Sequence, residues 1–132
     1  MGRRLILDTN VLINYERGHV DVASLDDDQI AIAALTVAEY RTVIELADTA
    51  ERADTRMRAL MAIVDAVGVL DYTERTAAHH ARLVAHARRS GQPRGAHDLI
   101  LAAPAAQSRR VLLTRDASAR FGGLPGVTAH EP

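Results

Sequence analysis

The stretch Leu5-Ile6-Leu7-Asp8-Thr9-Asn10 places a carboxylate at the end of a short aliphatic run, and apolar residues resume at Val11. The aliphatic run is typical of a short buried strand in a parallel sheet. Aspartate and asparagine are also frequent in turns. Asp8 is therefore either a turn residue or part of a functional site. The positions of the other acids in the chain distinguish these two interpretations.

Short apolar runs alternate with segments of helical periodicity along the rest of the chain. The apolar runs predict strands at residues 5–7, 30–35, 69–72, 111–114 and 126–129. The periodicity predicts one helix that begins at Thr36 and others at residues 11–16, 53–67, 73–90, 98–103 and 117–121. This order predicts an α/β fold with a short, mostly parallel sheet that is covered by helices on both faces.

Local signals set some of the element ends. Gly18 is expected to stop the first helix, Thr73 to cap the helix that follows it, and Gly91 to stop that helix. Pro104 is expected to end or kink its helix, because proline has no N–H to donate to the carbonyl of Ile100. The acid run at residues 26–28 lacks the glycine and glutamate of a calcium loop, so we interpret it as a solvated turn.

Composition limits the possible functions. The 132 residues are 48% apolar and 25% charged, which is typical of one folded domain, here residues 1–132. The absence of cysteine excludes disulfides, thiolate nucleophiles and cysteine-ligated zinc. All sixteen basic residues are arginine, so mechanisms that need a lysine, such as a P-loop or a Schiff base, are excluded. No apolar run approaches the roughly 20 residues of a membrane span, and we expect a cytoplasmic protein.

The charges are distributed unevenly. Residues 1–71 contain seven arginines and thirteen acids, whereas residues 72–132 contain nine arginines and four acids. Solvated helix faces explain most of these charges. The basic second half also leaves open a surface that binds a polyanion.

Four acids follow strands or begin helices, so all are expected at one edge of the sheet: Asp8, Glu39, Asp98 and Asp116. Each has a plain alternative. Asp8 could cap a helix, Thr36 and Glu39 match a capping box, Asp98 could favour a helix dipole, and Asp116 could be a turn residue. Their shared position favours a site, because clustered carboxylates repel one another unless a cation or protons neutralise them. Oxygen ligands suit Mg²⁺ or Mn²⁺, and such a site can hydrolyse phosphodiesters.

The motifs LILDTNVLIN, TVAE, PRGAHDLILAA and LLTRD, in this order, resemble those of PIN-domain ribonucleases, most closely the VapC-type toxins of bacterial toxin–antitoxin pairs. The resemblance covers nearly the whole chain. It implies a three-layer α/β/α fold, a homodimer, and a small antitoxin that blocks the active site. It also implies an active site of Asp8, Glu39, Asp98 and Asp116 that holds one or two Mg²⁺ or Mn²⁺ ions and activates a water to attack RNA.

In this resemblance Asp8, Asp98 and Asp116 are the metal ligands, and Asn10 and Thr114 support them. Many relatives carry a second acid shortly after the residue that matches Asp116, but this chain has Ala-Ser-Ala at residues 117–119, which puts a second metal site in doubt.

Other residues near the acids have weaker assignments. Arg94 and Arg115 flank Asp98 and Asp116 in sequence and are candidates to hold RNA phosphates. His97 is interpreted as a packed or capping residue. A module that keeps the fold but binds RNA or protein without cutting remains the alternative function. A phospho-aspartate phosphatase is disfavoured by the missing lysine and by Asn10, where a second aspartate would be expected.

Overall fold

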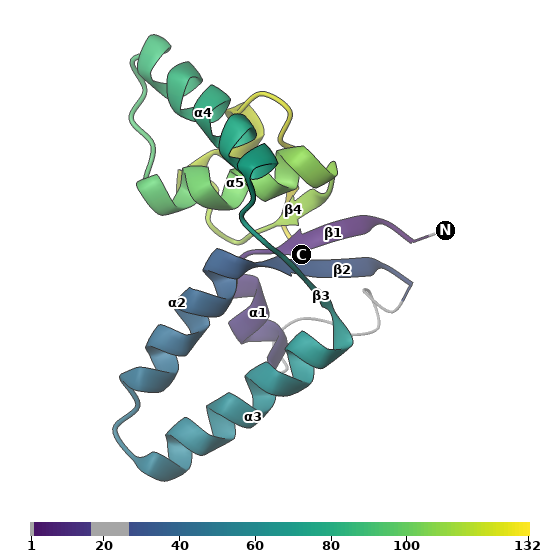
Figure 1. Cartoon of the computed structure of the whole chain (residues 1–132), viewed down its shortest axis with the longest axis vertical. Coiled ribbons are helices and arrows are strands. Elements are labelled where there is room, and N and C mark those ends of the chain that lie inside the picture. Colours follow the sequence, from purple (N-terminus) through teal and green to yellow (C-terminus); the bar gives the residue numbers. More distant parts are fainter. Residues whose placement is uncertain (1, 17–26) are drawn as a thin grey trace.

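A computed structural model describes residues 2–16 and 27–132 of the chain (Figure 1). The predicted helix stop at Gly18 and the first aspartate of the acid run, Asp26, lie outside these residues. The last aspartate of that run, Asp28, forms an ion pair of 2.9 Å with Arg3. Among the described residues no helix is long and apolar enough to cross a bilayer.

The centre of the fold in the described residues is a five-stranded sheet in which neighbouring strands are parallel, in the order β3-β2-β1-β4-β5. Its strands are β1 (Arg4–Leu7), β2 (Gln29–Ala33), β3 (Gly68–Leu70), β4 (Val111–Leu113) and β5 (Ala129–His130). The earliest strand, β1, lies in the middle, and Leu7 pairs with Leu113. The carboxyl ends of β1, β2 and β4 therefore lie side by side at one edge.

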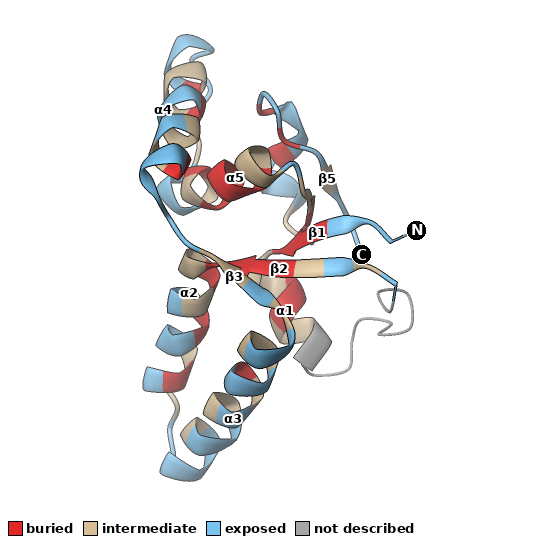
Figure 2. Cartoon of the chain, turned by 45° about the vertical axis from the view of Figure 1, so that its right-hand side comes forward, coloured by how far each residue is buried: buried red, intermediate tan, exposed pale blue. Residues whose placement is uncertain are grey.

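Helices cover both faces of this sheet (Figure 1). One side carries α1 (Thr9–Glu16), α2 (Ala34–Glu45) and α3 (Ala50–Ala66), and the other carries α4 (Glu74–Arg89) and α5 (Ala96–Ser108). Alternate residues of β1 enter the two cores: Ile6 packs with α4 and α5, whereas Leu5 and Leu7 pack with α1, α2 and α3. The buried residues accordingly concentrate along the sheet and the inner helix faces (Figure 2). The predicted three-layer α/β/α architecture is confirmed.

The start of α2 differs from the prediction. The helix begins at Ala34, directly after β2, so Leu35 is helical rather than extended. Ala33 is the N-cap and has no side-chain cap. Thr36 is fully buried, and its hydroxyl has no hydrogen-bond partner among the described residues. The proposed capping box of Thr36 and Glu39 is therefore wrong, because the short β2–α2 junction turns Thr36 into the core.

Pro104 lies inside α5, which continues to Ser108. The predicted helix end at this proline is wrong. Pro104 is buried, and α5 is the helix that lies against the sheet, with Leu101, Ala102, Ala103 and Ala105 also in the core. Burial of this apolar face offsets the one backbone hydrogen bond that proline removes. The Ser108 hydroxyl also donates to the carbonyl of Pro104, at 2.7 Å.

The remaining differences are at element ends. The cap at Thr73 is confirmed by its hydrogen bond from the Thr76 amide, and Gly91 has the positive φ expected of a helix stop. The helix predicted at residues 53–67 begins earlier, at Ala50. The segment predicted as one helix at residues 117–121 forms two 3₁₀ turns, η2 (Ala117–Ala119) and η3 (Phe121–Gly123). The last strand is shorter than residues 126–129 and begins at Ala129.

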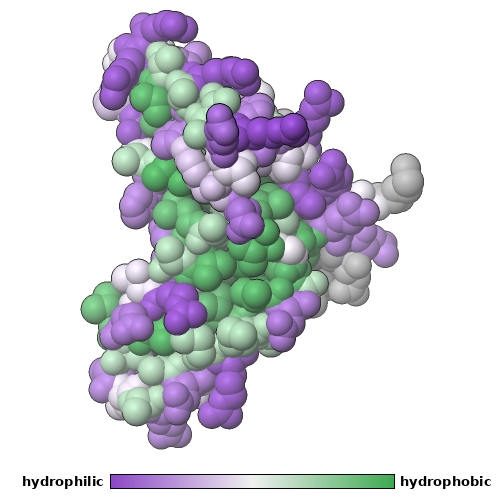
Figure 3. Space-filling view, in the orientation of Figure 1, coloured by the Kyte–Doolittle hydropathy of each residue, from purple (hydrophilic) through white to green (hydrophobic). Residues whose placement is uncertain are grey.

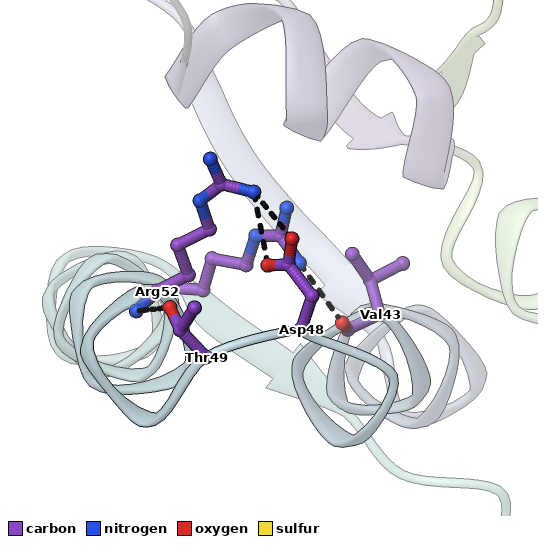
Figure 4. Close-up of polar contacts among 5 residues, drawn as sticks. Val43, Asp48, Thr49 and Arg52 are labelled. Carbon is purple, nitrogen blue, oxygen red and sulfur yellow. Dashed lines mark hydrogen bonds and ion pairs between the residues drawn. The ribbon is translucent and has the colours of Figure 1, made fainter.

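The connection between α2 and α3 is held by polar contacts (Figure 4). Thr49 accepts a hydrogen bond from the Arg52 amide, and the Arg52 guanidinium pairs with Asp48 at 2.8 Å. Arg56 donates to the carbonyl of Val43. These contacts border a cavity of about 580 Å³ between α1, α2 and α3, which none of the four acids lines.

Candidate active site

Asp8 lies at the junction of β1 and α1. Its amide donates to the carbonyl of Leu113 at 2.9 Å, and its carbonyl accepts the Leu12 amide of α1. The side chain accepts hydrogen bonds at both oxygens: Oδ1 from the Thr9 amide at 2.7 Å, and Oδ2 from the Thr114 hydroxyl at 2.8 Å. The carboxylate therefore contacts the first amide of the helix and the end of β4, and it is more than a helix cap.

Glu39 projects from the second turn of α2 toward α1. Its Oε1 accepts a hydrogen bond of 3.0 Å from the Thr9 hydroxyl, which is 30 residues away in sequence. The imidazole Nδ1 of His97 is 3.8 Å from Oε2. The His97 side chain is 70% exposed, so its interpretation as a packed residue is wrong.

Asp98 lies in the first turn of α5. No described residue donates a hydrogen bond to its carboxylate in the structure. The N-cap of α5 is Gly95, and a Cβ at that position would lie 3.0 Å from Asp98 Oδ2. The glycine thus leaves room for a carboxylate that folds back over the helix start.

Asp116 follows β4. Its amide donates to the Thr114 hydroxyl at 3.0 Å. Its Oδ1 accepts hydrogen bonds from both the amide and the hydroxyl of Ser118, at 3.1 and 2.5 Å. Asp116 Oδ1 therefore closes a turn, which agrees with the alternative that Asp116 is a turn residue.

Charge links the four acids into one cluster. Burial is the main reason why the pKa of Asp8 is raised, with further contributions from the charges of Glu39 and Asp98 and opposing ones from its hydrogen bonds. The pKa of Asp98 is also raised, first by burial and then by the charges of Asp116 and Glu39. His97 and Arg94 act on Asp98 in the opposite direction. The structure thus brings together four acids from four places in the fold: the β1–α1 junction, the second turn of α2, the first turn of α5 and the segment after β4.

The predicted supporting residues lie between these acids. Asn10 Nδ2 is 3.4 Å from Asp8 Oδ2, and Asn10 Oδ1 accepts the Arg115 amide at 3.3 Å. Thr114 is nearly buried and bonds to Asp8 with its hydroxyl while it accepts the amide of Asp116. One hydroxyl therefore links two of the candidate ligands.

The predicted phosphate-binding arginines are placed differently from each other. Arg94 Nη1 donates to the carbonyls of Ala119 and Arg120, at 2.6 Å each, and so ties the loop before α5 to η2. Arg115 is exposed at the end of β4. Arg94 is thus a fixed charge near Asp98.

Sequence reasoning missed Thr9 and Ser118 as contacts of the acids. Thr9 had no assigned part in the site, but its hydroxyl holds Glu39. Ser118 lies two residues after Asp116, and its hydroxyl donates to Asp116. The only available signal was that each hydroxyl lies within two residues of a candidate ligand.

The donor set fits a divalent ion. All four side chains offer oxygen, and at Asp98 the opposing charges of His97 and Arg94 do not cancel the combined effect of burial and of the neighbouring acids, so its pKa stays raised. Within residues 2–16 and 27–132, no three acids or histidines are arranged so that one ion could contact all of them. A site for Mg²⁺ needs only one or two protein carboxylates, because waters and substrate phosphates complete the coordination.

Comparison with known proteins identifies the family. The PIN domain matches residues 5–121. Ribonuclease VapC5 of Mycobacterium tuberculosis is 31% identical over 126 residues, which are 96% of this chain and 91% of that protein. A chain in the structure of VapBC-5, a member of the VapBC family of toxin–antitoxin systems from the same organism, is 28% identical with a TM-score of 0.80 and 98% of each chain covered. A chain of VapBC2 from Rickettsia felis, bound to a DNA fragment from its promoter, shares the fold, with a TM-score of 0.84, 18% identity and 98% of each chain covered. The chain therefore belongs to the PIN-domain family, and within that family to its VapC-type members.

Proposed function

We propose that this chain is a metal-dependent endoribonuclease that acts as the toxin of a toxin–antitoxin pair. The observation that carries the proposal is the meeting of Asp8, Glu39, Asp98 and Asp116 at one sheet edge, where Asp8 and Asp98 have raised pKa values. The similarity to Ribonuclease VapC5 supports RNA as the substrate. Since these acids are spread over residues 8–116, we assign the activity to one domain of residues 1–132.

We assign Asp8, Asp98 and Asp116 as the ligands of one or two Mg²⁺ or Mn²⁺ ions, with no more than two of these carboxylates on one ion and with waters and substrate phosphates completing the coordination. A divalent ion supplies an activated water and offsets the charge of a phosphodiester. Thr114 orients Asp8, and Ser118 fixes one oxygen of Asp116, which leaves the other available.

Glu39 is assigned to orient the attacking water, because Thr9 holds Oε1 and leaves Oε2 for another partner. The exposed imidazole of His97 lies beside Glu39 Oε2, at 3.8 Å. Arg94 and Arg115 remain candidates to contact the phosphates of the RNA.

The partner is a small cognate antitoxin, as the similarity to VapBC-5 supports. A basic side chain of the antitoxin, most simply an arginine, would enter the acid cluster and form charge-assisted hydrogen bonds with its carboxylates. Adding the antitoxin should then suppress cleavage. A complex in which Asp8 and Asp98 stay open to solvent would contradict this mode of inhibition.

A homodimer is also part of the proposal. The middle of the face in Figure 3 is hydrophobic, between the hydrophilic parts above and below it. Tyr72 and Met61 are large side chains that are about half exposed. Apolar surface of this kind marks interaction sites. Sedimentation of the purified chain tests the dimer directly, and a monomer at micromolar concentration would contradict it.

The test of the function is cleavage of a labelled single-stranded RNA by the purified chain, with Mg²⁺ or Mn²⁺ and with chelator. We expect cleavage that the chelator abolishes. Asp8→Asn and Asp98→Asn should each reduce the rate by at least about 10²-fold, the lower range for loss of one acid–base group. Asp54→Asn, on exposed α3, is the matched control and should cleave like wild type. Binding of RNA without any cleavage would instead favour the non-catalytic module.

A further inference from the structure

Helix α4 carries an excess of positive charge. It contains Arg75, Arg82, Arg88 and Arg89, together with three histidines, and its one acid is Glu74. All four arginines are exposed. Among the described residues, the structure gives the Arg88 guanidinium no hydrogen-bond or ion-pair partner. In Figure 3 the surface over α4, at the top of the view, is mainly hydrophilic, with a few hydrophobic side chains between.

A groove of about 520 Å³ separates α4 from the loop that leads into α5. Val84, Ala87 and Arg88 line it on α4, and Pro93, Arg94 and Leu99 line it on the other side. Its floor is thus apolar, while two arginines stand at its sides. None of the described residues that line this groove is acidic.

The groove lies near the candidate active site, because Arg94 lines the groove and its charge also acts on Asp98. Ala96 and Leu99, which both line it, lie in the first helical turns of α5 on either side of Asp98. A strand that enters the groove therefore leads toward the carboxylates.

We propose that this groove binds the RNA strand next to the phosphate that is cut, with a base on the apolar floor and flanking phosphates at Arg88 and Arg94. The inference rests on the proposed function and assigns its substrate path. Positive side chains position a nucleic acid through its phosphates, and apolar surface accepts a base without regard to sequence. A protein partner would require a complementary acidic surface, whereas RNA carries the required charge at every residue.

The test is binding of a fluorescent single-stranded RNA by anisotropy, in chelator so that no cleavage occurs. Arg88→Ala removes one phosphate contact, and Arg58→Ala on exposed α3 is the matched control. For a single strand, each lost contact reduces the slope of log affinity against log salt by about 0.7. Raising salt from about 50 to 200 mM should therefore weaken RNA binding by the Arg88→Ala variant about 2.6-fold less than binding by wild type. Arg88→Lys should retain most of the salt slope. Val84→Gln should weaken RNA binding but leave the salt slope unchanged.

Cleavage kinetics with Mn²⁺ give a second measurement. Because Arg88 does not touch the reacting atoms, Arg88→Ala should raise KM and leave kcat near the wild-type value. Melting temperatures of all variants show whether each is folded. Because Arg88 is exposed, Arg88→Ala should leave the melting temperature unchanged.

Three outcomes would overturn the inference. If Arg88→Ala and Arg58→Ala bind RNA alike while wild type cleaves, the groove is not the RNA path and the proposed function stands. If Arg88→Ala leaves RNA affinity unchanged but converts a sedimenting dimer to a monomer, the groove belongs to an interface between copies. If wild type neither binds nor cleaves RNA, the proposed function fails together with the groove.

Discussion

Thr114→Val tests the hydroxyl that links Asp8 to Asp116. In the wild type this hydroxyl donates to Asp8 Oδ2 at 2.8 Å and accepts the Asp116 amide at 3.0 Å. Thr114 is 6% exposed, so water cannot easily replace either bond. Valine has nearly the same shape and retains the β-branch that suits the end of a strand.

The expected loss follows from these two bonds. A hydrogen bond to a charged group contributes about 1.5–3 kcal/mol, and a bond between neutral groups about 0.5–1.5 kcal/mol. The extra buried methyl of valine offsets up to about 0.8 kcal/mol. Because Asp8 and Asp116 are only half buried, we expect the lower part of the range, a net loss of about 1.5–3 kcal/mol. For a domain of this size, that lowers the melting temperature by roughly 5–15 °C.

The loss should depend on pH. The Thr114 hydrogen bond lowers the pKa of Asp8, which burial raises. Without it, the folded-state pKa of Asp8 rises further above the unfolded value. A raised folded-state pKa means that stability is lost as the pH rises through the interval between the two values. The variant should therefore lose more stability than wild type toward neutral pH, and the part due to Asp8 should vanish below about pH 3–4.

Urea unfolding followed by circular dichroism, at neutral and acid pH in chelator, measures both effects. Thr114→Ser keeps the hydroxyl and should restore most of the stability. Thr55→Val on α3 is the matched control, since it loses only an exposed bond to the Glu51 carbonyl. A Thr114→Val protein as stable as Thr55→Val, or a deficit of the same size at both pH values, would refute the role assigned to this hydroxyl.

Three other substitutions test the rest of the cluster. Asp98→Asn should make the metal-free protein more stable near pH 7 by about 0.5–1 kcal/mol. The substitution removes the screened repulsion between Asp98 and the neighbouring carboxylates. It also removes the favourable interaction of a negative charge with the α5 dipole, which cancels only part of the gain. Because the pKa of Asp98 is raised, this gain in stability should disappear below about pH 3–4. If thermal melting shows that the variant is less stable than wild type at pH 7, Asp98 acts as a helix cap instead. Thr9→Val should release Glu39 and lower kcat with little change in KM. Thr9→Ser keeps the hydroxyl and should have a kcat near that of wild type. Equal kcat for wild type and both variants would mean that this contact has no part in catalysis. Gly95→Ala should displace the Asp98 carboxylate by a few tenths of an ångström and reduce cleavage several-fold without lowering the melting temperature by more than a few degrees, since small misplacements of a catalytic group slow catalysis. Unchanged cleavage by Gly95→Ala would mean that the space beside Asp98 is not needed.

The sequence by itself determined the kind and order of the elements. Periodicity records which face of a segment is buried, so the aliphatic run before Asp8 predicted the central strand, and the alternation of runs predicted the parallel sheet. Local signals such as the cap at Thr73 were also reliable, because both partners lie within one helical turn. Prediction was wrong where packing outweighed a local preference. Burial of the α5 face kept Pro104 inside a helix, and the tight end of β2 placed Thr36 in the core.

The sequence could also list the four acids, because each follows a strand or begins a helix. Only the tertiary structure decided how they meet. The strand order puts β1 between β2 and β4, so the ends of three strands bring Asp8, Glu39 and Asp116 to one edge. The contacts that orient them join residues far apart in the chain, such as Thr9 with Glu39 and Thr114 with Asp8. A hydroxyl bonds to whichever acceptor lies within about 3 Å in space, and sequence spacing holds no record of that distance.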